Sequence, residues 1–308
     1  MPRVLITGGA GFIGSHVAEA CLARGHEVWV ADDLSTGALE NVPKAILEAN
    51  RFVKADICDD LATVAPGLPF DAVFHLAGKI NLREAYAEPE RYAAVNTGGA
   101  LNVARFALAR GATRFIFSSS AAVYGADAQL PTPEDSVLEP ASPYGQTKLE
   151  AERQLATLLE GTPVDLTCLR YANAYGPRQA YSAHTGFLAV LLHRGLAGEP
   201  VVVLGDGQQT RDFVYVEDIA AANLLAFERR LNGVFNVATG IETSILETVA
   251  AVEAAIGKPI NKTFGPPAVG DVRRSALDSS RLRALGWEAT VAVPEGLAKT
   301  VEFYRSRR

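Results

Sequence analysis

Tyr144 and Lys148 have the spacing that places a phenol and an ammonium on one face of a helix. A nearby positive charge favours the phenolate, so Lys148 is expected to lower the pKa of Tyr144. A tyrosine tuned in this way can take a proton from a substrate hydroxyl and return it. The same spacing also occurs in helices where the ring only packs and the amine is solvated, so its meaning depends on the rest of the chain.

A glycine-rich turn, Thr7-Gly8-Gly9-Ala10-Gly11-Phe12-Ile13-Gly14, follows the first predicted strand and opens the first predicted helix. Such a turn brings the backbone close to a dinucleotide, and the helix N-terminus offers N–H groups to its pyrophosphate. The second predicted strand runs into Asp32, whose carboxylate can accept hydrogen bonds from ribose hydroxyls and repels a 2′-phosphate. Asp33 adds to this repulsion. The joint pattern predicts an NAD site rather than an NADP site.

Short apolar strands alternate with helical patterns in the first half of the chain. The predicted strands are Arg3–Thr7, Glu27–Ala31, Arg51–Lys54, Ala72–Leu76, Arg114–Ser118 and Val164–Leu169, and the predicted helices are Phe12–Arg24, Pro89–Arg110 and Pro143–Glu160. This alternation predicts an α/β fold with a doubly wound, mostly parallel (Rossmann) sheet and right-handed crossovers. Because strand C-termini form the ligand crevice of such sheets, Ser120 is expected on the same edge as the glycine turn.

The pattern breaks into loops after Asn173. The predicted helices there are Phe187–Ala197, Ile245–Ile256, Ser279–Leu285 and Glu295–Arg305, and the predicted strands are Val201–Leu204, Phe213–Val216 and Val234–Val237. We expect the last two strands to rejoin the first layer. The predicted division is therefore a Rossmann domain of residues 1–172 with 213–239, and a smaller C-terminal α/β substrate-binding domain of residues 173–212 and 240–308.

The composition excludes several classes of protein. The 308 residues are 48% hydrophobic and 21% charged, which supports a full core, and the net charge of −6 argues against nucleic acid as a partner. Cys21, Cys58 and Cys168 lack metal-ligand spacing and are expected to pack in the core, so no metal site is predicted. With no apolar run of membrane-spanning length and no signal peptide before the first strand, we expect a cytoplasmic protein that does not bind membranes.

Further motifs follow in order along the chain. They are Asp32-Asp33-Leu34-Ser35-Thr36-Gly37, Asp56-Ile57, His75-Leu76-Ala77-Gly78, Asn96, Ser118-Ser119-Ser120-Ala121-Ala122-Val123-Tyr124-Gly125, the segment from Leu169 to Gln179, and the segment from Gly205 to Phe213. With the glycine turn and the Tyr144/Lys148 pair, they make the chain resemble the extended short-chain dehydrogenase/reductase family, and within it the nucleotide-sugar epimerases. The resemblance runs from Arg3 nearly to the C-terminus.

The resemblance implies a set of NAD-binding residues. They are Gly8, Gly11, Phe12, Ile13 and Gly14; Asp32, Asp33, Leu34, Ser35, Thr36 and Gly37; Asp56 and Ile57 at the adenine; Leu76, Ala77 and Gly78 at the pyrophosphate and ribose; and Ser118, Tyr144, Lys148 and Tyr171. Lys79 either reaches a phosphate or is a solvated loop lysine. Asn96 either touches the cofactor region or only packs a helix on a strand. His75 is expected to be structural.

The resemblance also assigns the catalytic roles. Ser120 lies at the reacting hydroxyl, Tyr144 accepts its proton, and Lys148 holds the nicotinamide ribose. The implied reaction moves the C4 hydride of a sugar to NAD⁺, which gives a transient 4-keto sugar; the sugar rotates and hydride returns to its other face. The residues after Ser120 are Ala121 and Ala122, where dehydratases of the family carry an Asp-Glu pair and decarboxylases an acid. Epimerisation at C4 is therefore favoured.

The substrate site is implied less completely. Asn173 and Arg211 are expected at the diphosphate, although Arg211 has the alternative of a salt bridge with Asp212. Val203, Phe213 and Ile245 are expected around the uracil and ribose, with Asp271 on the ribose hydroxyls. Ala268 stands where the family carries a diphosphate-binding arginine, and Arg273, Arg274 or Arg178 is expected to supply part of that charge. Ser275 replaces a bulky residue and leaves room for N-acetyl groups.

The expected activity is inversion of C4 in a UDP-hexose, UDP-glucose or UDP-galactose and also N-acetylated forms. One alternative is another nucleotide-sugar enzyme of the family, such as a dTDP- or GDP-sugar epimerase, a reductase or a dehydratase. The other is a non-catalytic dinucleotide sensor, which would not need Ser120, Tyr144 and Lys148 together. The resemblance also implies a homodimer formed through the helices at residues 89–110 and 143–160.

Overall fold

Seven parallel strands form one sheet in the part of the chain that the structure, a computed structural model, describes: residues 1–181, 186–267 and 272–307. The strand order is β11-β6-β5-β4-β1-β2-β3. The strands are β1 (Arg3–Thr7), β2 (Glu27–Asp32), β3 (Phe52–Lys54), β4 (Ala72–His75), β5 (Arg114–Ser120), β6 (Asp165–Tyr171) and β11 (Gly233–Val237). This order reverses on either side of β1, which confirms the predicted doubly wound α/β fold.

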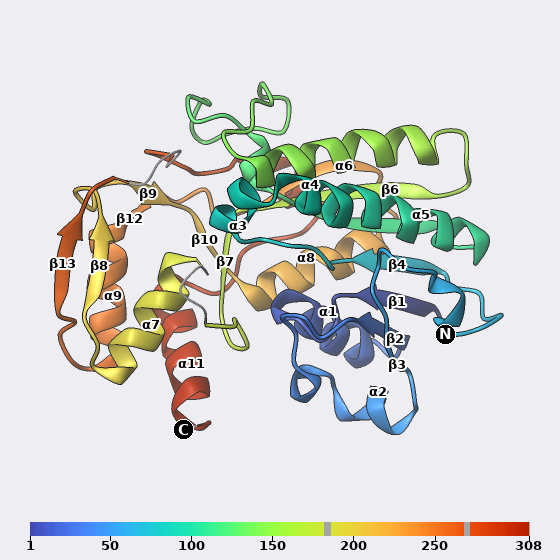
Figure 1. The fold of residues 1–308 in the computed structure, drawn as a ribbon, viewed down its shortest axis with the longest axis horizontal. Helices are drawn as coiled ribbons and strands as arrows, with labels where there is room; N and C mark the ends of the chain where they lie inside the picture. The colour runs from blue at the N-terminus through green and yellow to red at the C-terminus, as the bar shows by residue number, and fades with distance from the viewer. Residues whose placement is uncertain (182–185, 268–271, 308) are drawn as a thin grey trace.

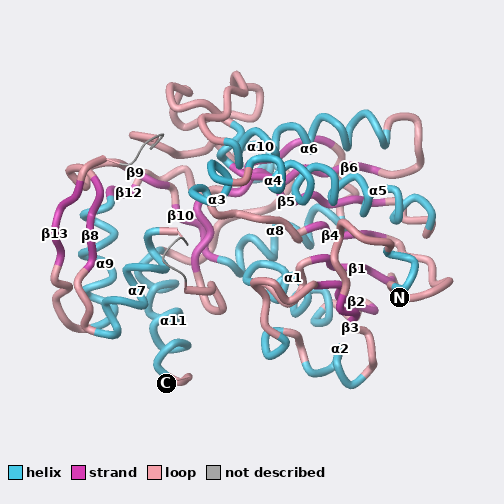
Figure 2. The backbone as a smooth tube through the Cα atoms, in the orientation of Figure 1, coloured by secondary structure: helices cyan, strands magenta, loops and turns pink. Residues whose placement is uncertain are grey.

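Side chains along β1 point alternately to the two faces of the main sheet, and each face has its own core and its own helices (Figures 1 and 2). Val4 and Ile6 face a core shared with α1 (Phe12–Ala23) and α8 (Val216–Glu228), which pack against each other. Leu5 faces the opposite core, shared with α5 (Ala100–Ala109) and α6 (Pro143–Leu159). The sheet is therefore covered by helices on both faces.

The helix predicted over 89–110 has three parts. They are α4 (Pro89–Tyr92), a π-helical segment η3 (Ala93–Gly99) and α5. The wider π turn carries Asn96, which is 1% exposed and bonded to the loop after β4. Such π segments occur mostly at functional positions, and this one turns a polar side chain inward at the site.

The C-terminal lobe has its own core, which is drawn from Tyr175 through Val301. Its elements are β8 (Val201–Leu204) paired with β13 (Lys262–Gly265), β9 (Thr210–Arg211) paired with β12 (Thr243–Ser244), and the helices α7 (Phe187–Ala197), α9 (Ile245–Ile256) and α11 (Val293–Arg305). In Figure 1 this lobe lies beside the carboxyl edge of the main sheet.

Of the two strands predicted to rejoin the main sheet, one does not do so. β10 (Phe213–Tyr215) does not rejoin the main sheet but pairs with β7 (Asn173–Tyr175), and only β11 adds to the edge of the sheet beside β6. Helix α8 was not predicted. It begins after Tyr215, carries Glu217 and Asp218 in its first turn, and brings the chain back across α1.

Short elements complete the fold: η1 (Leu39–Asn41), α2 (Lys44–Glu48), η2 (Leu61–Thr63), α3 (Leu82–Ala87), η4 (Ala121–Val123) and α10 (Ser280–Ala284). Cys21 and Cys168 are buried as expected, but Cys58 is exposed because it lies in the loop after β3. Among the described residues, none of the helices has the length and apolar character of a membrane span, and no His, Cys, Asp or Glu side chains gather as metal ligands.

Candidate active site

Ser120, Tyr144 and Lys148 meet where β5 ends against the start of α6. Ser142 caps α6 by accepting from the N–H of Gly145, which begins the helix just before Tyr144. Tyr144 and Ser120 share a hydrogen bond and both are partly exposed, whereas Lys148 is 4% exposed. The structure therefore brings the predicted catalytic groups together, with two hydroxyls at the surface of the crevice and the amine behind them.

The electrostatics of Tyr144 differ from the sequence prediction. Burial raises the pKa of Tyr144, and the hydrogen bond with Ser120 is the interaction that opposes this effect. Lys148 is itself desolvated, which lowers its pKa to about 8, and its Nζ donates to the Ser118 carbonyl at 2.8 Å. The prediction that Lys148 lowers the pKa of Tyr144 is therefore corrected: in this structure Ser120 opposes the effect of burial.

The glycine turn has the close approaches that a dinucleotide site needs. Gly8 has a φ of +72°, and a Cβ built on it would lie 2.6 Å from the Ala77 nitrogen. A Cβ on Gly14 would lie 2.1 Å from the Gly8 carbonyl oxygen. Gly11 is the N-cap of α1, and no side chain accepts a capping hydrogen bond from the first turn of the helix. The turn thus leaves backbone donors available and fits a pyrophosphate.

Asp32 organises the loop that closes over this turn. Its carboxylate is 6% exposed and accepts from the N–H groups of Ala10 at 3.0 Å and Leu34 at 2.8 Å. Burial raises the pKa of Asp32, and these two N–H groups oppose the rise. Two donors do not saturate a carboxylate, so Asp32 retains acceptor capacity for ribose hydroxyls. The residues that follow, Asp33 through Gly37, form the adjoining loop, in which Asp33 accepts from the N–H and Oγ of Ser35.

Asn96 and Lys79 both lie at the loop that follows β4. The Asn96 amide accepts from Lys79 N at 2.8 Å and donates to Lys79 O at 3.0 Å and to Thr147 Oγ1 at 3.0 Å. Asn96 therefore ties the loop after β4 to α6, and a Cβ on Gly78 would meet its Oδ1 at 3.0 Å. The Lys79 ammonium pairs with Glu84 at 2.8 Å and stays partly exposed, so its contact with a phosphate stays a prediction.

Several other predicted cofactor residues are buried. Tyr171 is 5% exposed, and its hydroxyl bonds with Asn223 of α8 and with Ser118. Ile57 is 6% exposed and packs against Gly99, while Asp56 is exposed and accepts from Cys58 N. His75 bonds with Thr7 Oγ1 at 2.7 Å and stacks on Phe117, and burial lowers its pKa to about 3. A neutral buried imidazole agrees with its predicted structural role.

Comparison with known proteins decides the family. The sequence profile of the NAD dependent epimerase/dehydratase family matches residues 4–238. The chain belongs to this family.

The similarity to individual members extends over almost the whole chain. It is 41% identical to a UDP-glucose 4-epimerase of Mycolicibacterium smegmatis, over 99% of both chains. Among solved structures, a Thermotoga maritima UDP-glucose 4-epimerase with UDP-glucose has a TM-score of 0.91 and 37% identity over 99% of both chains. A Thermus thermophilus UDP-glucose 4-epimerase complex with NAD has a TM-score of 0.91 and 36% identity, covering 99% of this chain and 100% of that one.

Arg211 occupies a backbone-lined position in this epimerase/dehydratase family member. Its Nη1 donates to the carbonyls of Thr210 at 2.6 Å and Val272 at 2.7 Å. Its neighbour Asp212 is fully buried and accepts from Thr239 and Gly240 instead, so the alternative of an Arg211–Asp212 salt bridge is excluded. Asn173 donates through Nδ2 to the Asp212 carbonyl at 3.2 Å. Arg211 and Asn173 are thus brought to one region by the same segment.

Three of the predicted base-binding residues lie in the core of the C-terminal lobe. Val203 is fully buried, and Phe213 and Ile245 are each 5% exposed. Little of these side chains is left for a ligand to touch, because the period of two along β8 turns Val203 inward and leaves Val202 48% exposed. Their contact with a base stays a prediction. Ala268 and Asp271 lie outside the described residues.

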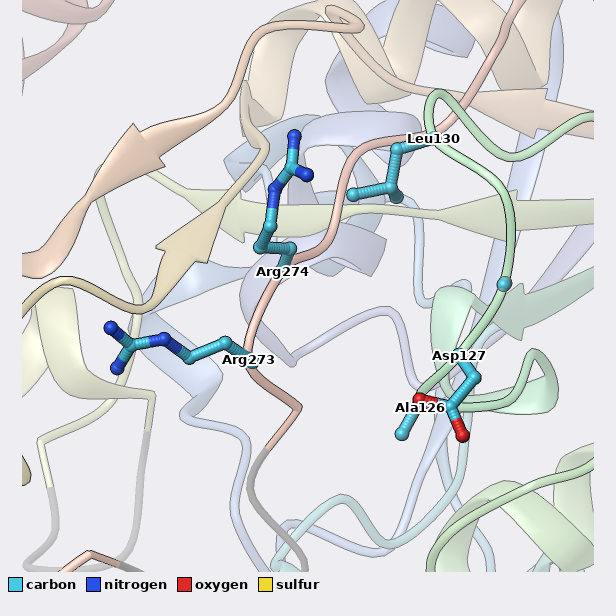
Figure 3. Close-up of a pocket in the computed structure, with 6 residues that line it drawn as sticks. Ala126, Asp127, Leu130, Arg273 and Arg274 are labelled. Atoms are coloured by element: carbon cyan, nitrogen blue, oxygen red, sulfur yellow. The ribbon is translucent and has the colours of Figure 1, made fainter.

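The three arginines proposed to replace the missing one are all engaged with acids. Arg273 pairs with Asp206 at 2.7 and 2.9 Å, and Arg274 with Glu242 at 2.9 and 2.5 Å. Arg178 pairs with Glu19, which lies beyond the N-terminal turns of α1. A hollow of about 390 Å³ separates Arg273 and Arg274 from the loop formed by Ala126, Asp127, Ala128 and Leu130. In Figure 3 the Arg273 side chain points away from Ala126 and Asp127 of that loop. Their contact with a diphosphate stays a prediction, and each of them would have to contact it while paired with an acid or after leaving that acid.

A buried ion pair that the sequence patterns did not predict lies next to the catalytic groups. Glu152 and Arg170 are 6% and 3% exposed, and Arg170 donates to both carboxylate oxygens, at 3.0 and 2.6 Å. Two signals were present in the chain. Glu152 continues the Tyr144/Lys148 spacing by one more turn, and Arg170 is a charged residue within an apolar strand, which requires a buried partner.

Proposed function

We propose that the protein is an NAD-dependent epimerase that inverts C4 of UDP-hexoses. The observation that carries this proposal is the pairing of Tyr144 with Ser120 in front of Lys148, followed by the untitratable side chains of Ala121 and Ala122. These groups can move one proton at one hydroxyl but supply no second acid or base for elimination. The full-length similarity to UDP-glucose 4-epimerases supports the same reaction.

The residues of the chain would act as follows. Tyr144 takes the proton of the sugar 4-hydroxyl, and Ser120 hydrogen-bonds the same oxygen and holds Tyr144 in place. Lys148 lies behind them, anchored by the Ser118 carbonyl, where it would hold the nicotinamide ribose. Tyr144 then returns the proton to the inverted hydroxyl. Because the proton is taken and returned by one group, the site needs no separate acid.

The glycine turn, Asp32 and the loop tied down by Asn96 fit NAD. The close approaches at Gly8 and Gly14 leave a cradle of backbone N–H groups for the pyrophosphate, and Asp32 offers acceptors to the adenosine ribose. When bound, NAD supplies the hydride acceptor and donor for C4. The protein contributes orientation and exclusion of water.

Product analysis on a panel of UDP-, dTDP- and GDP-sugars tests this function. We expect UDP-glucose to be converted to UDP-galactose with no net change in redox state. Conversion of dTDP- or GDP-sugars alone, or formation of a dehydrated or reduced product, would instead support one of the other nucleotide-sugar activities. Tight NAD binding without turnover of any sugar would support a sensor.

Arg211→Ala is expected to weaken UDP-sugar binding. A charged donor to a diphosphate is worth about 1.5–3 kcal/mol, so KM for UDP-glucose should rise about 10- to 100-fold. NAD affinity should be unchanged, because Arg211 belongs to β9 in the C-terminal lobe. Initial-rate kinetics and calorimetry with NAD check both parts. An unchanged KM would place the diphosphate elsewhere.

Ser275→Tyr is expected to separate two sugar classes. Ser275 is partly buried in the segment after Arg274, and a small side chain there leaves room for an N-acetyl group. We expect the natural protein to turn over both UDP-glucose and UDP-N-acetylglucosamine, and the variant to lose at least about tenfold in kcat/KM for the second alone, as steric exclusion in a pocket typically gives. Equal losses for both sugars would contradict the role of Ser275, as would failure of the natural protein to accept the N-acetylated sugar.

We also propose that the protein is a homodimer formed through the α4–η3–α5 helix and α6. These helices lie side by side on one face of the sheet in Figures 1 and 2, and pack on each other. Light scattering after gel filtration measures the mass, and reversal of the charge at the exposed position 105 of α5, by Arg105→Glu, should weaken the dimer.

A further inference from the structure

A continuous set of buried polar contacts begins directly beneath Lys148. Glu152 follows Lys148 by one turn on the same face of α6. Its carboxylate accepts from Ser119 Oγ at 2.5 Å and from Arg170 Nε at 3.0 Å and Nη2 at 2.6 Å. Ser119 lies between Ser118, whose carbonyl accepts from Lys148, and Ser120, which bonds with Tyr144. One carboxylate thus holds the end of β5 against the helix that carries Tyr144 and Lys148.

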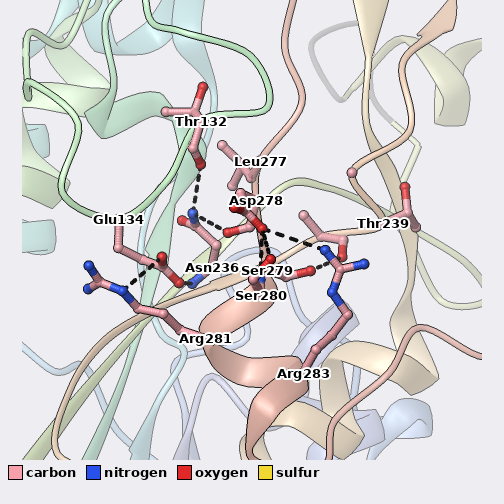
Figure 4. Close-up of polar contacts among 12 residues, drawn as sticks. Thr132, Glu134, Asn236, Thr239, Leu277, Asp278, Ser279, Ser280, Arg281 and Arg283 are labelled. Atoms are coloured by element: carbon pink, nitrogen blue, oxygen red, sulfur yellow. Dashed lines mark hydrogen bonds and ion pairs between the residues drawn. The ribbon is translucent and has the colours of Figure 1, made fainter.

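The contacts continue from Arg170 toward the C-terminal segment. Arg170 Nη1 donates to Tyr124 Oη at 2.9 Å and to the Glu134 carbonyl at 3.1 Å. Tyr124 donates to Asn236 Oδ1 at 2.8 Å, and Asn236 N donates to Glu134 Oε1 at 2.9 Å. In Figure 4, Asn236 lies between Thr132 and Asp278 and donates to both of their carbonyls, while Arg281 of α10 approaches Glu134. Glu152 is therefore fixed from several elements and has no freedom to turn away.

The charges around Lys148 make Glu152 the main group that favours its charged form. Burial lowers the pKa of Lys148 to about 8, and the charge of Glu152 opposes this effect. The other titratable groups facing this pair are His75 from β4, Cys168 and Arg170 from β6, and Tyr144. Burial lowers the pKa of His75 to about 3 and raises that of Cys168 well above its ordinary value, so both stay neutral near neutral pH.

We propose that Glu152, held by Arg170, is a positioning residue of the catalytic centre: it fixes Ser118–Ser120 against α6 and keeps the Lys148 amine protonated. This inference rests on the proposed function only for its effect on turnover. It differs from a purely structural role, because the charge of Glu152 acts on Lys148 in addition to holding the fold together.

Glu152→Gln is the direct test, because it keeps the shape of the side chain and removes its charge. The double variant Glu152→Gln/Arg170→Met removes both charges of the ion pair, so that Arg170 is not left buried without its carboxylate, and it covers the case in which the single variant does not fold. The control is Asp218→Asn, another buried carboxylate with three donors, from Thr290 and Val291, located on α8 away from Lys148.

Two readouts are taken on the NAD-loaded protein. The pKa of Lys148 is followed by NMR titration of ¹³C-labelled lysine, with the resonance assigned through Lys148→Arg. The alkaline limb of the kcat/KM profile for UDP-glucose is followed in parallel. We expect both to move about one pH unit lower in the Glu152→Gln variants, as loss of one adjacent charge predicts, and to stay in place in Asp218→Asn.

An unchanged Lys148 pKa in a folded Glu152→Gln variant would overturn the inference, as would an equal shift in the control. The NMR readout does not require turnover. A natural protein inactive on UDP-sugars would therefore contradict the proposed function, while the titration would still decide the role of Glu152.

Discussion

Tyr144→Phe is expected to reduce kcat for UDP-glucose epimerisation by about 10²- to 10⁴-fold, the range in which general acid–base groups contribute. The variant removes one oxygen from a partly exposed ring at the start of α6 and keeps the ring itself. Burial raises the pKa of this phenol and the Ser120 hydroxyl opposes the rise, and the variant removes the only titratable atom of this side chain. Steady-state kinetics with UDP-glucose, together with thermal unfolding and NAD titration, measure the effect.

Tyr304→Phe is the matched control for this loss. Tyr304 also donates its hydroxyl to a protein oxygen, the Gln179 carbonyl, but lies on α11 in the C-terminal lobe. Deleting its oxygen should cost about 1 kcal/mol of stability and leave kcat unchanged. If Tyr144→Phe retained a tenth or more of the natural kcat, Tyr144 would not be the group that moves the proton.

Gly8→Ala is expected to abolish NAD binding at micromolar cofactor. The new methyl group would lie 2.6 Å from Ala77 N and 2.8 Å from Ala77 Cα, and the backbone φ of +72° disfavours any side chain. Ala77 belongs to the loop after β4 that Asn96 ties to η3, so this backbone cannot move without disturbing the cofactor site. The combined strain and overpacking should destabilise the protein by about 3 kcal/mol or more.

Gly25→Ala separates the effect of backbone strain from the effect of the close contact with Ala77. Gly25 has nearly the same φ, +75°, but a Cβ there meets nothing within 4 Å. It should cost about 1–2 kcal/mol through backbone strain alone and leave NAD affinity unchanged. Calorimetric titration with NAD and urea unfolding of both variants give the comparison. Equal effects of the two substitutions would show that close approach of Gly8 to Ala77 does not shape the site.

The sequence patterns that predict the structure correctly are those set by a single local interaction. The period of two in Arg3–Thr7 and the glycine turn after it both reflect steric demands within a few residues, and both predict the structure well. The i, i+4 spacing of Tyr144 and Lys148 likewise needs only helix geometry. Such features depend on contacts that are close in sequence.

The errors arise where distant segments decide the outcome. Phe213–Tyr215 is as apolar as a sheet strand, but its pairing with Asn173–Tyr175 depends on where α8 brings the chain. The spacing of Tyr144 and Lys148 alone predicts that Lys148 lowers the pKa of Tyr144. Burial raises the pKa of Tyr144, and the hydrogen bonds of Tyr144 to Ser120 and of Lys148 to the Ser118 carbonyl come from another element, β5. The ion pair of Lys79 with Glu84 of α3 likewise depends on an element that the Lys79 motif does not contain.

The most direct test of C4 epimerisation is conversion of UDP-[4-²H]glucose by the purified protein in ordinary water. We predict UDP-galactose that retains deuterium at C4, because the hydrogen removed from C4 as hydride is returned to the same carbon without exchange, while Tyr144 handles only the hydroxyl proton. Loss of the label to solvent, or recovery of UDP-glucose unchanged, would contradict the mechanism.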